Sequence, residues 1–189
     1  MRELVYYVAV SIDGYIAAPD GSFNSFPLEG DHMQTILTEY ADALPSHVLD
    51  SLGTDAPRSR FDTVIQGWNT YAVAHSVGIN RPYAHLREFV ATRTRTTNDQ
   101  AVSFTRDALA TVQELKQEEG LSIYLCGGGD LAGHLLPEID RLILKRNPVA
   151  LGAGISLFGG GDVRPTSFRL VNVRSFSSGV VIEEYESAH

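Results

Sequence analysis

The sequence predicts one α/β domain over residues 1–189, with a mixed, mostly parallel sheet flanked by helices and a β-hairpin at the C-terminal end. Three observations support this fold class. Apolar, β-branched runs alternate with segments whose apolar residues recur at helical spacing. The C-terminal end instead holds two neighbouring strand-like segments around Ser177-Ser178-Gly179. The 189 residues, 43% of them apolar, are enough to build a single hydrophobic core.

The first strand is expected at Leu4–Val10, a nearly continuous apolar run that is typical of a strand covered on both faces. Asp13-Gly14 then marks one turn and Pro19-Asp20-Gly21 a second. A central strand therefore leads into a structured loop, where site residues are often found. Asp13 can equally do no more than hydrogen-bond its own turn.

The rest of the chain alternates strand-like and helix-like segments. Strands are expected where β-branched and aromatic residues cluster, at 61–67, 87–92, 102–104, 123–126 and 141–144. Helices are expected where apolar residues recur on one side, at 31–43, 46–52, 68–78, 107–119 and 131–136. The segments 168–176 and 180–185 form the hairpin. Strands separated by helices favour parallel pairing, and the hairpin adds an antiparallel edge.

Composition excludes several classes of function. A net charge of −8 makes nucleic-acid binding improbable, because that affinity depends on Lys and Arg neutralising phosphates. The single cysteine, Cys126, excludes an internal disulfide and suits a small buried residue. The six histidines have no metal-ligand spacing and no GxSxG motif occurs, so neither metal-dependent nor hydrolytic chemistry is expected. Without a signal-peptide or membrane-spanning pattern, we expect a cytoplasmic protein with no membrane partner.

The stretch Ile123–Leu136 holds the clearest candidate binding feature. A short apolar strand runs into Gly127-Gly128-Gly129, and a helical stripe of leucines follows. Glycines let the backbone approach a ligand closely, and the free N–H groups of a helix start bind phosphate. The alternative is a sharp turn in which Asp130 is an ordinary N-cap. The motif matches neither GxGxxG nor a phosphate-binding loop with Lys-Ser/Thr.

Four junctions after expected strands end in residues suited to a nucleotide. They are Val8–Ile16, Gly67–Thr70, Thr92–Arg95 and Gly127–Leu131. In open α/β sheets, ligands bind outside the carboxyl ends of the strands, where loops from several strands meet. The four junctions together therefore predict a cofactor cleft.

Five segments in order resemble the dihydrofolate reductase-like superfamily, in the branch that includes the reductase domain of riboflavin biosynthesis (RibD C-terminal domain-like). The segments are Ser11–Ala17, Asp62–Gly67 with Thr70-Tyr71, Tyr124–Gly129, Pro148–Gly154 with Leu157-Phe158, and Ser178–Val181. They span nearly the whole chain. The resemblance implies an eight-stranded mixed sheet, reduction with NADPH and, as in related stand-alone members, a homodimer.

The resemblance also implies roles for particular residues. Val8, Ala9 and Ile16 would line the nicotinamide pocket. The pyrophosphate would be held by Gly127, Gly128, Gly129, Asp130 and Leu131, with Gly67, Trp68, Asn69 and Thr70 at the neighbouring junction, where Thr70 caps a phosphate. Arg93, with Thr92 and Thr94, would meet the adenosine 2′-phosphate. A peptide between two of these glycines is often cis in the superfamily, so a cis bond is expected within Gly127–Gly129.

One departure concerns the cofactor phosphate. In the superfamily that the chain resembles, the second junction usually reads Gly-Arg-x-Thr-Tyr-Glu. This chain has Trp68 in place of the arginine. An indole cannot replace a bidentate guanidinium contact. Arg93 and Arg95 can compensate, so NADPH remains the expected cofactor, with NADH or a flavin less excluded than usual.

The proton donor is expected on the first helix. Reduction of a C=N bond requires a proton on nitrogen, which a carboxylic acid in an apolar cleft can supply. Asp31 is the best match to the acid of the family, and Glu29 is the alternative. Asp31 can instead be only an acidic residue at a helix start, stabilised by the helix dipole.

These observations predict an NADPH-dependent reductase of a small heterocycle, pterin-like or a ribosylaminopyrimidine. The alternative is a binding or sensing protein that keeps the nucleotide site and has lost the reduction. Trp68 and the uncertain acid favour this alternative somewhat.

Overall fold

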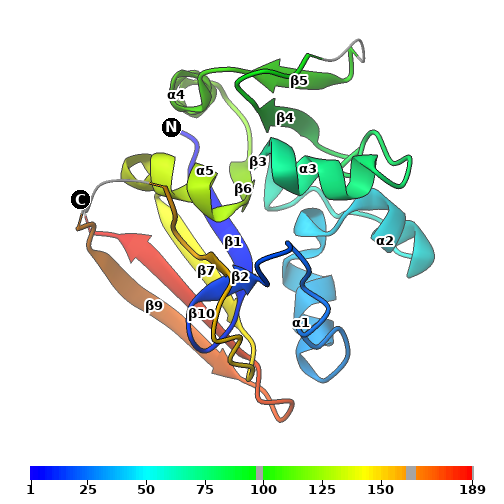
Figure 1. Cartoon of the computed structure of the whole chain (residues 1–189), viewed down its shortest axis with the longest axis vertical. Coiled ribbons are helices and arrows are strands. Elements are labelled where there is room, and N and C mark those ends of the chain that lie inside the picture. The colour runs from blue at the N-terminus through cyan, green and yellow to red at the C-terminus, as the bar shows by residue number, and fades with distance from the viewer. Residues whose placement is uncertain (97–99, 161–164, 189) are drawn as a thin grey trace.

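The computed structural model describes residues 1–96, 100–160 and 165–188. An eight-stranded sheet in the order β5-β4-β3-β6-β1-β7-β10-β9 runs through the molecule (Figure 1). The strands of this sheet are β1 (Leu4–Val10), β3 (Phe61–Gly67), β4 (Arg87–Ala91), β5 (Val102–Thr105), β6 (Ser122–Gly127), β7 (Arg141–Arg146), β9 (Phe168–Ser175) and β10 (Val181–Ser187). The predicted α/β class and eight-stranded mixed sheet are confirmed.

The pairing is parallel from β5 to β7 and antiparallel at the hairpin edge. Tyr6 of β1 lies opposite Leu125 of β6 on one side and Leu142 of β7 on the other. The strand β10 then runs antiparallel to β7, and β9 antiparallel to β10. The six strands from β5 to β7 therefore end at the same edge of the sheet.

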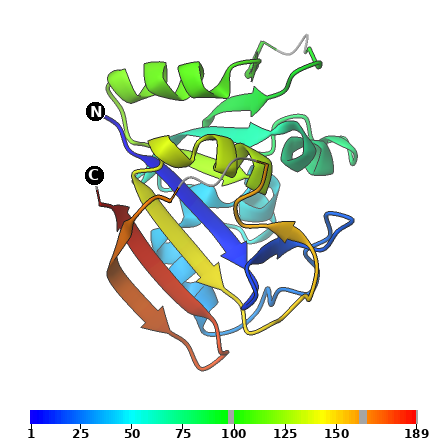
Figure 2. The same cartoon turned by 60° about the vertical axis from the view of Figure 1, so that its left-hand side comes forward.

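Helices cover both faces of the sheet (Figure 2). One face carries α1 (His32–Glu39), the 3₁₀ turn η1 (Ala41–Ala43), α2 (Ser46–Ser51) and α3 (Trp68–His75). The other carries α4 (Ala108–Gln117), α5 (Gly129–His134) and the 3₁₀ turn η2 (Leu136–Glu138). Alternate residues of each strand supply the two cores: Tyr6 packs on the α4–α5 face and Tyr7 on the α1 face.

The first helix and two short strands differ from the sequence prediction. The helix expected over 31–43 ends at Glu39 and is followed by η1, because Tyr40 leaves the helical conformation and stacks on Tyr7 at 4.9 Å. The turn segment after β1 and the glycine-rich connection also contain two short strands, β2 (Tyr15–Ala17) and β8 (Ile155–Ser156), which pair antiparallel. Strands of two or three residues are too short to show a periodic pattern.

Asp42 in η1 fixes the loop that leads into β3. Its buried carboxylate accepts hydrogen bonds from the backbone N–H groups of Arg58, Ser59, Arg60 and Phe61, at 2.6 to 3.2 Å. Buried backbone donors need such partners, because an unpaired one costs about 1–3 kcal/mol. One carboxylate thus holds the chain where it enters the central sheet.

The strand β9 forms one outer edge of the sheet, and Leu170 and Val173 on it are about half exposed. The homodimer implied by the resemblance stays a prediction.

None of the helices in the described ranges is long and apolar enough to cross a membrane.

Candidate functional site

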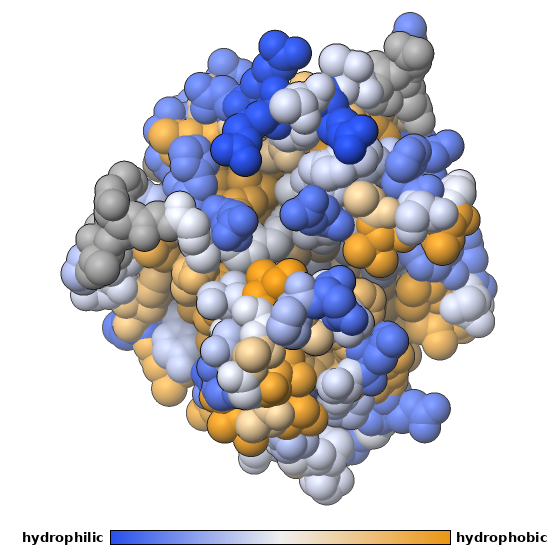
Figure 3. Space-filling model, viewed as in Figure 1, coloured by the Kyte–Doolittle hydropathy of each residue, from blue (hydrophilic) through white to orange (hydrophobic). Residues whose placement is uncertain are grey.

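The four predicted junctions lie together, at the end of the sheet formed by the carboxyl ends of the parallel strands. They follow β1, β3, β4 and β6, which are neighbours in the order β4-β3-β6-β1 and all run parallel (Figure 1). Neighbouring parallel strands end side by side, so their exit loops meet. Figure 3 shows strongly hydrophilic side chains over α4, β4 and β5, and hydrophobic ones at the surface between α5 and β2.

The two glycine-containing junctions are in contact with each other. Gly67 is the N-cap of α3 and Gly128 the N-cap of α5. A Cβ added at Gly67 would lie 3.7 Å from the Gly128 nitrogen, and one at Gly128 would lie 3.6 Å from the Thr70 hydroxyl. Two helix starts and one hydroxyl therefore surround the same point, an arrangement that suits phosphate oxygens.

The Gly127–Gly128 peptide is cis, as expected within Gly127–Gly129. The alternative role for Asp130 as N-cap is wrong, because Gly128 takes that position and Asp130 lies inside the first turn of α5. The Asp130 carboxylate lies beside Gly159 and Gly160 of the following connection.

Gly129 and Gly133 are required by packing. A Cβ at Gly129 would overlap the carbonyl oxygen of Ser156, and one at Gly133 would overlap that of Gly159. The Gly159 N–H also donates to the Gly129 carbonyl at 3.0 Å. The connection that follows β8 therefore lies directly on α5, and it needs bare backbone there.

The predicted nicotinamide-lining residues divide between the two faces of β1. Val8, Ile16 and Leu131 pack, partly buried, against the core on the α4–α5 face. Ala9 alternates to the α1 face, where it is also partly buried and lies opposite Lys145 of β7. Val8, Ile16 and Leu131 thus form one apolar wall beside α5.

Trp68 holds a basic side chain at the start of α3. The guanidinium of Arg95 lies 4.8 Å from the centre of the Trp68 ring, and Phe104 of β5 meets the other part of the indole edge-on. A cation over an indole is attracted by about 0.5–1 kcal/mol at exposed sites. Arg93, Thr94 and Asn69 are exposed, and Thr92 is half-buried, accepting from the Arg95 N–H through its hydroxyl at 3.2 Å.

The catalytic role expected for Asp31 is not supported by its geometry. Its carboxylate accepts from the N–H and hydroxyl of Ser177, both at 2.7 Å, and from the Ser178 N–H at 3.1 Å. The hydrogen bonds from Ser177 hold the pKa of Asp31 well below its usual range. An acid that delivers a proton needs the opposite shift. The carboxylate instead ties α1 to the turn of the C-terminal hairpin, and Glu29 is exposed.

We expect Asp31→Asn to loosen this tie without removing chemistry. The pKa of Asp31 is lowered in the fold, so its stabilisation is complete above the ordinary pKa of 3.8 and is lost as the pH falls below that value. The variant should melt below the wild type at neutral pH, and the difference should shrink in acid. NADPH oxidation with a reducible pterin or pyrimidine should stay within about threefold, whereas loss of a proton donor costs 10²- to 10⁴-fold.

Asp13 connects two loops rather than only its own turn. Its carboxylate accepts from the Ser11 hydroxyl at 2.6 Å and from the N–H groups of Leu151 and Gly152 at 3.1 and 2.6 Å. The bond from Ser11, followed by those from the backbone, lowers the pKa of Asp13 to about 2. The loop after β1 is therefore fixed to the connection that packs on α5.

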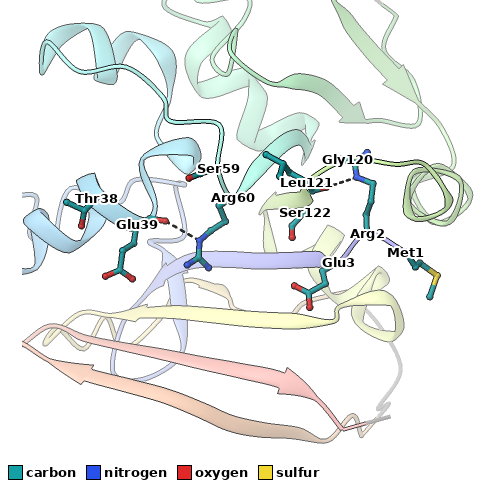
Figure 4. Close-up of a pocket in the computed structure, with 10 residues that line it drawn as sticks. All are labelled: Met1, Arg2, Glu3, Thr38, Glu39, Ser59, Arg60, Gly120, Leu121 and Ser122. Carbon is teal, nitrogen blue, oxygen red and sulfur yellow. Dashed lines mark hydrogen bonds between the residues drawn. The ribbon is translucent and has the colours of Figure 1, made fainter.

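A hollow of about 710 Å³ lies at the opposite edge of the sheet (Figure 4). Glu3 and Ser122 in its wall stand at the amino ends of β1 and β6. Its basic groups are already engaged: Arg2 pairs with Asp62 and donates to the Leu121 carbonyl at 2.6 Å, and the Arg60 Nε donates to the Glu39 carbonyl at 3.1 Å. We do not regard this hollow as the site, because the exit loops lie at the other edge.

The sheet order, the crossing loops and the paired helix starts define a protein of the dihydrofolate reductase-like fold class. A protein of Shewanella sp. PV-4 assigned to riboflavin biosynthesis superposes with a TM-score of 0.72 over 100% of both chains, at 22% identity. Dihydrofolate reductase from Enterococcus faecalis, solved with NADP(H), superposes with a TM-score of 0.63 over 99% of this chain and 97% of that one, at 14% identity.

The chain belongs to the RibD C-terminal domain family, whose model matches residues 2–182. It is 33% identical over 186 residues to YwjB of Bacillus subtilis (strain 168), an uncharacterized protein, which covers 95% of each chain. It also superposes on the deaminase/5-amino-6-(5-phosphoribosylamino)uracil reductase of Thermotoga maritima with a TM-score of 0.68, at 17% identity, over 99% of this chain and 57% of that one. The family resemblance inferred from the sequence is confirmed.

Proposed function

We propose that the protein is an NADPH-dependent reductase that transfers a hydride to a small heterocyclic ring. The observation that supports this most is the contact between the starts of α3 and α5, where Gly67, Thr70 and Gly128 leave main-chain donors around one point. Proteins of the RibD C-terminal domain family bind NADP(H), and this chain matches that family over residues 2–182.

In this proposal each junction has one task. The starts of α3 and α5 bind the pyrophosphate through backbone N–H groups and the Thr70 hydroxyl. The apolar wall of Val8, Ile16 and Leu131 faces the nicotinamide and keeps water from the transferred hydride. Arg95, held on Trp68, supplies the positive charge for a 2′-phosphate. The nicotinamide supplies the hydride, and the protein binds and orients both rings.

The test uses the one tryptophan of the chain as a probe. Trp68 stands at the proposed site, so titration with NADPH should quench its fluorescence and saturate. Addition of oxidised pterins or pyrimidines should then consume NADPH. Absence of any fluorescence or calorimetric response to NADPH at millimolar concentration would disprove the proposal.

A binding or sensing protein on the same fold is the second candidate. It is favoured by Asp31, whose carboxylate is held ionised by the hairpin turn. This candidate predicts saturable NADPH binding with no turnover of any ring. The same two measurements therefore separate it from the reductase.

A further inference from the structure

Lys145 is a buried lysine at the carboxyl end of β7, on the sheet face that α1 covers. The residue is 7% exposed, and within the described residues its Nζ makes one hydrogen bond, to the Pro27 carbonyl at 3.1 Å. It lies opposite Ala9 of β1 and opposite Ile182 of β10. Ala9 is only partly buried, so solvent reaches the sheet beside Lys145.

The charge of Lys145 has no counter-charge within the described part of the chain. Lys116, the other buried lysine, is also 7% exposed, and its Nζ contacts Asp140 at 2.8 Å and Glu138 at 3.5 Å. Lys145 forms no such ion pair with any described carboxylate. Buried charges in proteins are normally paired, because an isolated one is costly to desolvate. The missing partner of Lys145 is therefore expected to come from outside the described residues, as a bound ligand would.

No described carboxylate pairs with Lys145 among the groups that face it. Glu184, on the same face of β10 as Ile182, accepts instead from the Tyr40 hydroxyl at 2.9 Å. From α1 comes His32, which is fully buried and whose Nδ1 lies 3.1 Å from the Ser178 hydroxyl. From β1 and β10 come the apolar side chains of Ala9 and Ile182. Burial lowers the pKa of Lys145, as expected for an ammonium without a partner.

A second underused donor lies three strands away on the same face. Gln66 near the end of β3 is 1% exposed, and its amide Nε2 has no hydrogen-bond partner among the described residues. It shares the α1 face with Val64, two residues earlier. The strands β6 and β1 lie between β3 and β7, so the two donors stand on backbones roughly 14 Å apart. Cys126 and Ala9, both partly buried, are the residues in between.

We propose that Lys145 and Gln66 are the anchoring donors for the substrate ring, and that this ring presents carbonyl or oxyanion acceptors at both ends, one of them negatively charged. The inference rests on the proposed reductase function. The nicotinamide beside Val8 and the substrate ring beside Ala9 would approach the carboxyl end of β1 from its two faces and meet where the strand ends. The inference makes Lys145 and Gln66 responsible for the choice of substrate ring, and it requires no carboxylate in the substrate site. Lys145 binds the oxyanion, and Gln66 donates to the far carbonyl.

This assignment distinguishes two classes of ring. A 2-amino-4-oxo ring such as pterin offers N–H donors on its 2-amino side, which need an acceptor such as a carboxylate. A 2,4-dioxo ring such as lumazine offers carbonyl acceptors instead and can lose a ring proton to become an oxyanion. With pterin, a protein donor would face the N–H donors of the 2-amino side, and both would stay unpaired. With lumazine, the same donor would face a carbonyl acceptor. A buried donor without a partner costs free energy, so pterin should bind more weakly. The protein should therefore prefer the dioxo ring.

The experiment compares lumazine and pterin, which differ at the 2-position, on the full chain saturated with NADP⁺ so that no turnover occurs. Titration calorimetry of the wild type should give lumazine an affinity at least about tenfold above that of pterin. Lys145→Met should weaken lumazine binding about 10- to 100-fold and leave pterin and NADP⁺ binding unchanged. The matched control is Arg146→Met, the next residue of β7, which points to the other face and pairs with Glu183 at 2.8 Å. Arg146→Met should leave the affinities for lumazine and for pterin unchanged.

Thermal unfolding gives a readout that a purely structural lysine would not produce. Methionine fills the same space without the unpaired charge, so Lys145→Met should raise Tm by about 2–4 °C. Gln66→Leu, which removes the far donor, should weaken lumazine binding several-fold. Four outcomes would each overturn the inference. They are a fall in the Tm of Lys145→Met, binding of pterin by the wild type as tight as or tighter than that of lumazine, a ring preference unchanged in Lys145→Met, and no binding of either ring at millimolar concentration. Failure of NADP⁺ to bind would instead disprove the proposed function, and titration of both rings without cofactor would still test Lys145.

Discussion

Replacing Gly133 by alanine is expected to lower the free energy of unfolding by more than about 3 kcal/mol and to weaken NADPH binding with it. The added Cβ would overlap the Gly159 carbonyl oxygen, which belongs to backbone and cannot turn aside as a side chain would. Either α5 or the connection after β8 must move. The start of α5 is part of the proposed pyrophosphate seat and the connection packs directly on this helix, so stability and affinity should fall together.

Chemical denaturation and titration calorimetry with NADPH measure the two effects. The matched control is Gly67→Ala at the start of α3, where an added Cβ would meet its nearest atoms at 3.7 Å, an ordinary contact, and where φ is −75°. That variant should lose no more than about 1 kcal/mol, the cost of alanine at an N-cap. Equal stability losses in the two variants would contradict the packing role assigned to Gly133.

The sequence patterns predicted the sheet because each strand is a local signal. Apolar runs such as Leu4–Val10, separated by amphipathic segments, indicate parallel pairing without knowledge of distant contacts. The four junctions followed from the same reasoning, since parallel strands end together. The short strands β2 and β8 were missed because they are defined only by their pairing with each other, from Tyr15 to Ser156.

The roles of single residues were less predictable, because they depend on partners far away in the chain. Asp31 matched a proton donor by its place at a helix start, but Ser177, 146 residues further on, takes its carboxylate. Gly129 was predicted to hold the pyrophosphate from its place in the glycine run, and nothing local shows that the Ser156 carbonyl oxygen also requires bare backbone there. Lys145 lies in an apolar strand, and nothing local shows that it is buried without a carboxylate.

Replacing Arg95 by glutamine is expected to reduce the affinity for NADPH about 10- to 100-fold while NADH changes by less than about threefold, because only NADPH carries the 2′-phosphate that a guanidinium binds. The side chain is positioned for this by the Trp68 ring at 4.8 Å. Titration calorimetry with both nucleotides gives the ratio directly. Arg93→Gln is the matched control on the same exposed loop. Loss of the NADPH preference in that variant instead would assign the phosphate to Arg93.

Trp68→Ala then tests whether the indole acts through Arg95. Without the ring the guanidinium loses its stacking partner, so the NADPH preference should fall by about 2- to 5-fold, the equivalent of an exposed cation–π contact. In the Arg95→Gln background the same change should alter the preference no further, because the group that the ring positions is already absent. If the two substitutions instead lower the NADPH preference additively, Trp68 contacts the nucleotide itself. The role of Trp68 in positioning Arg95 would then be disproved.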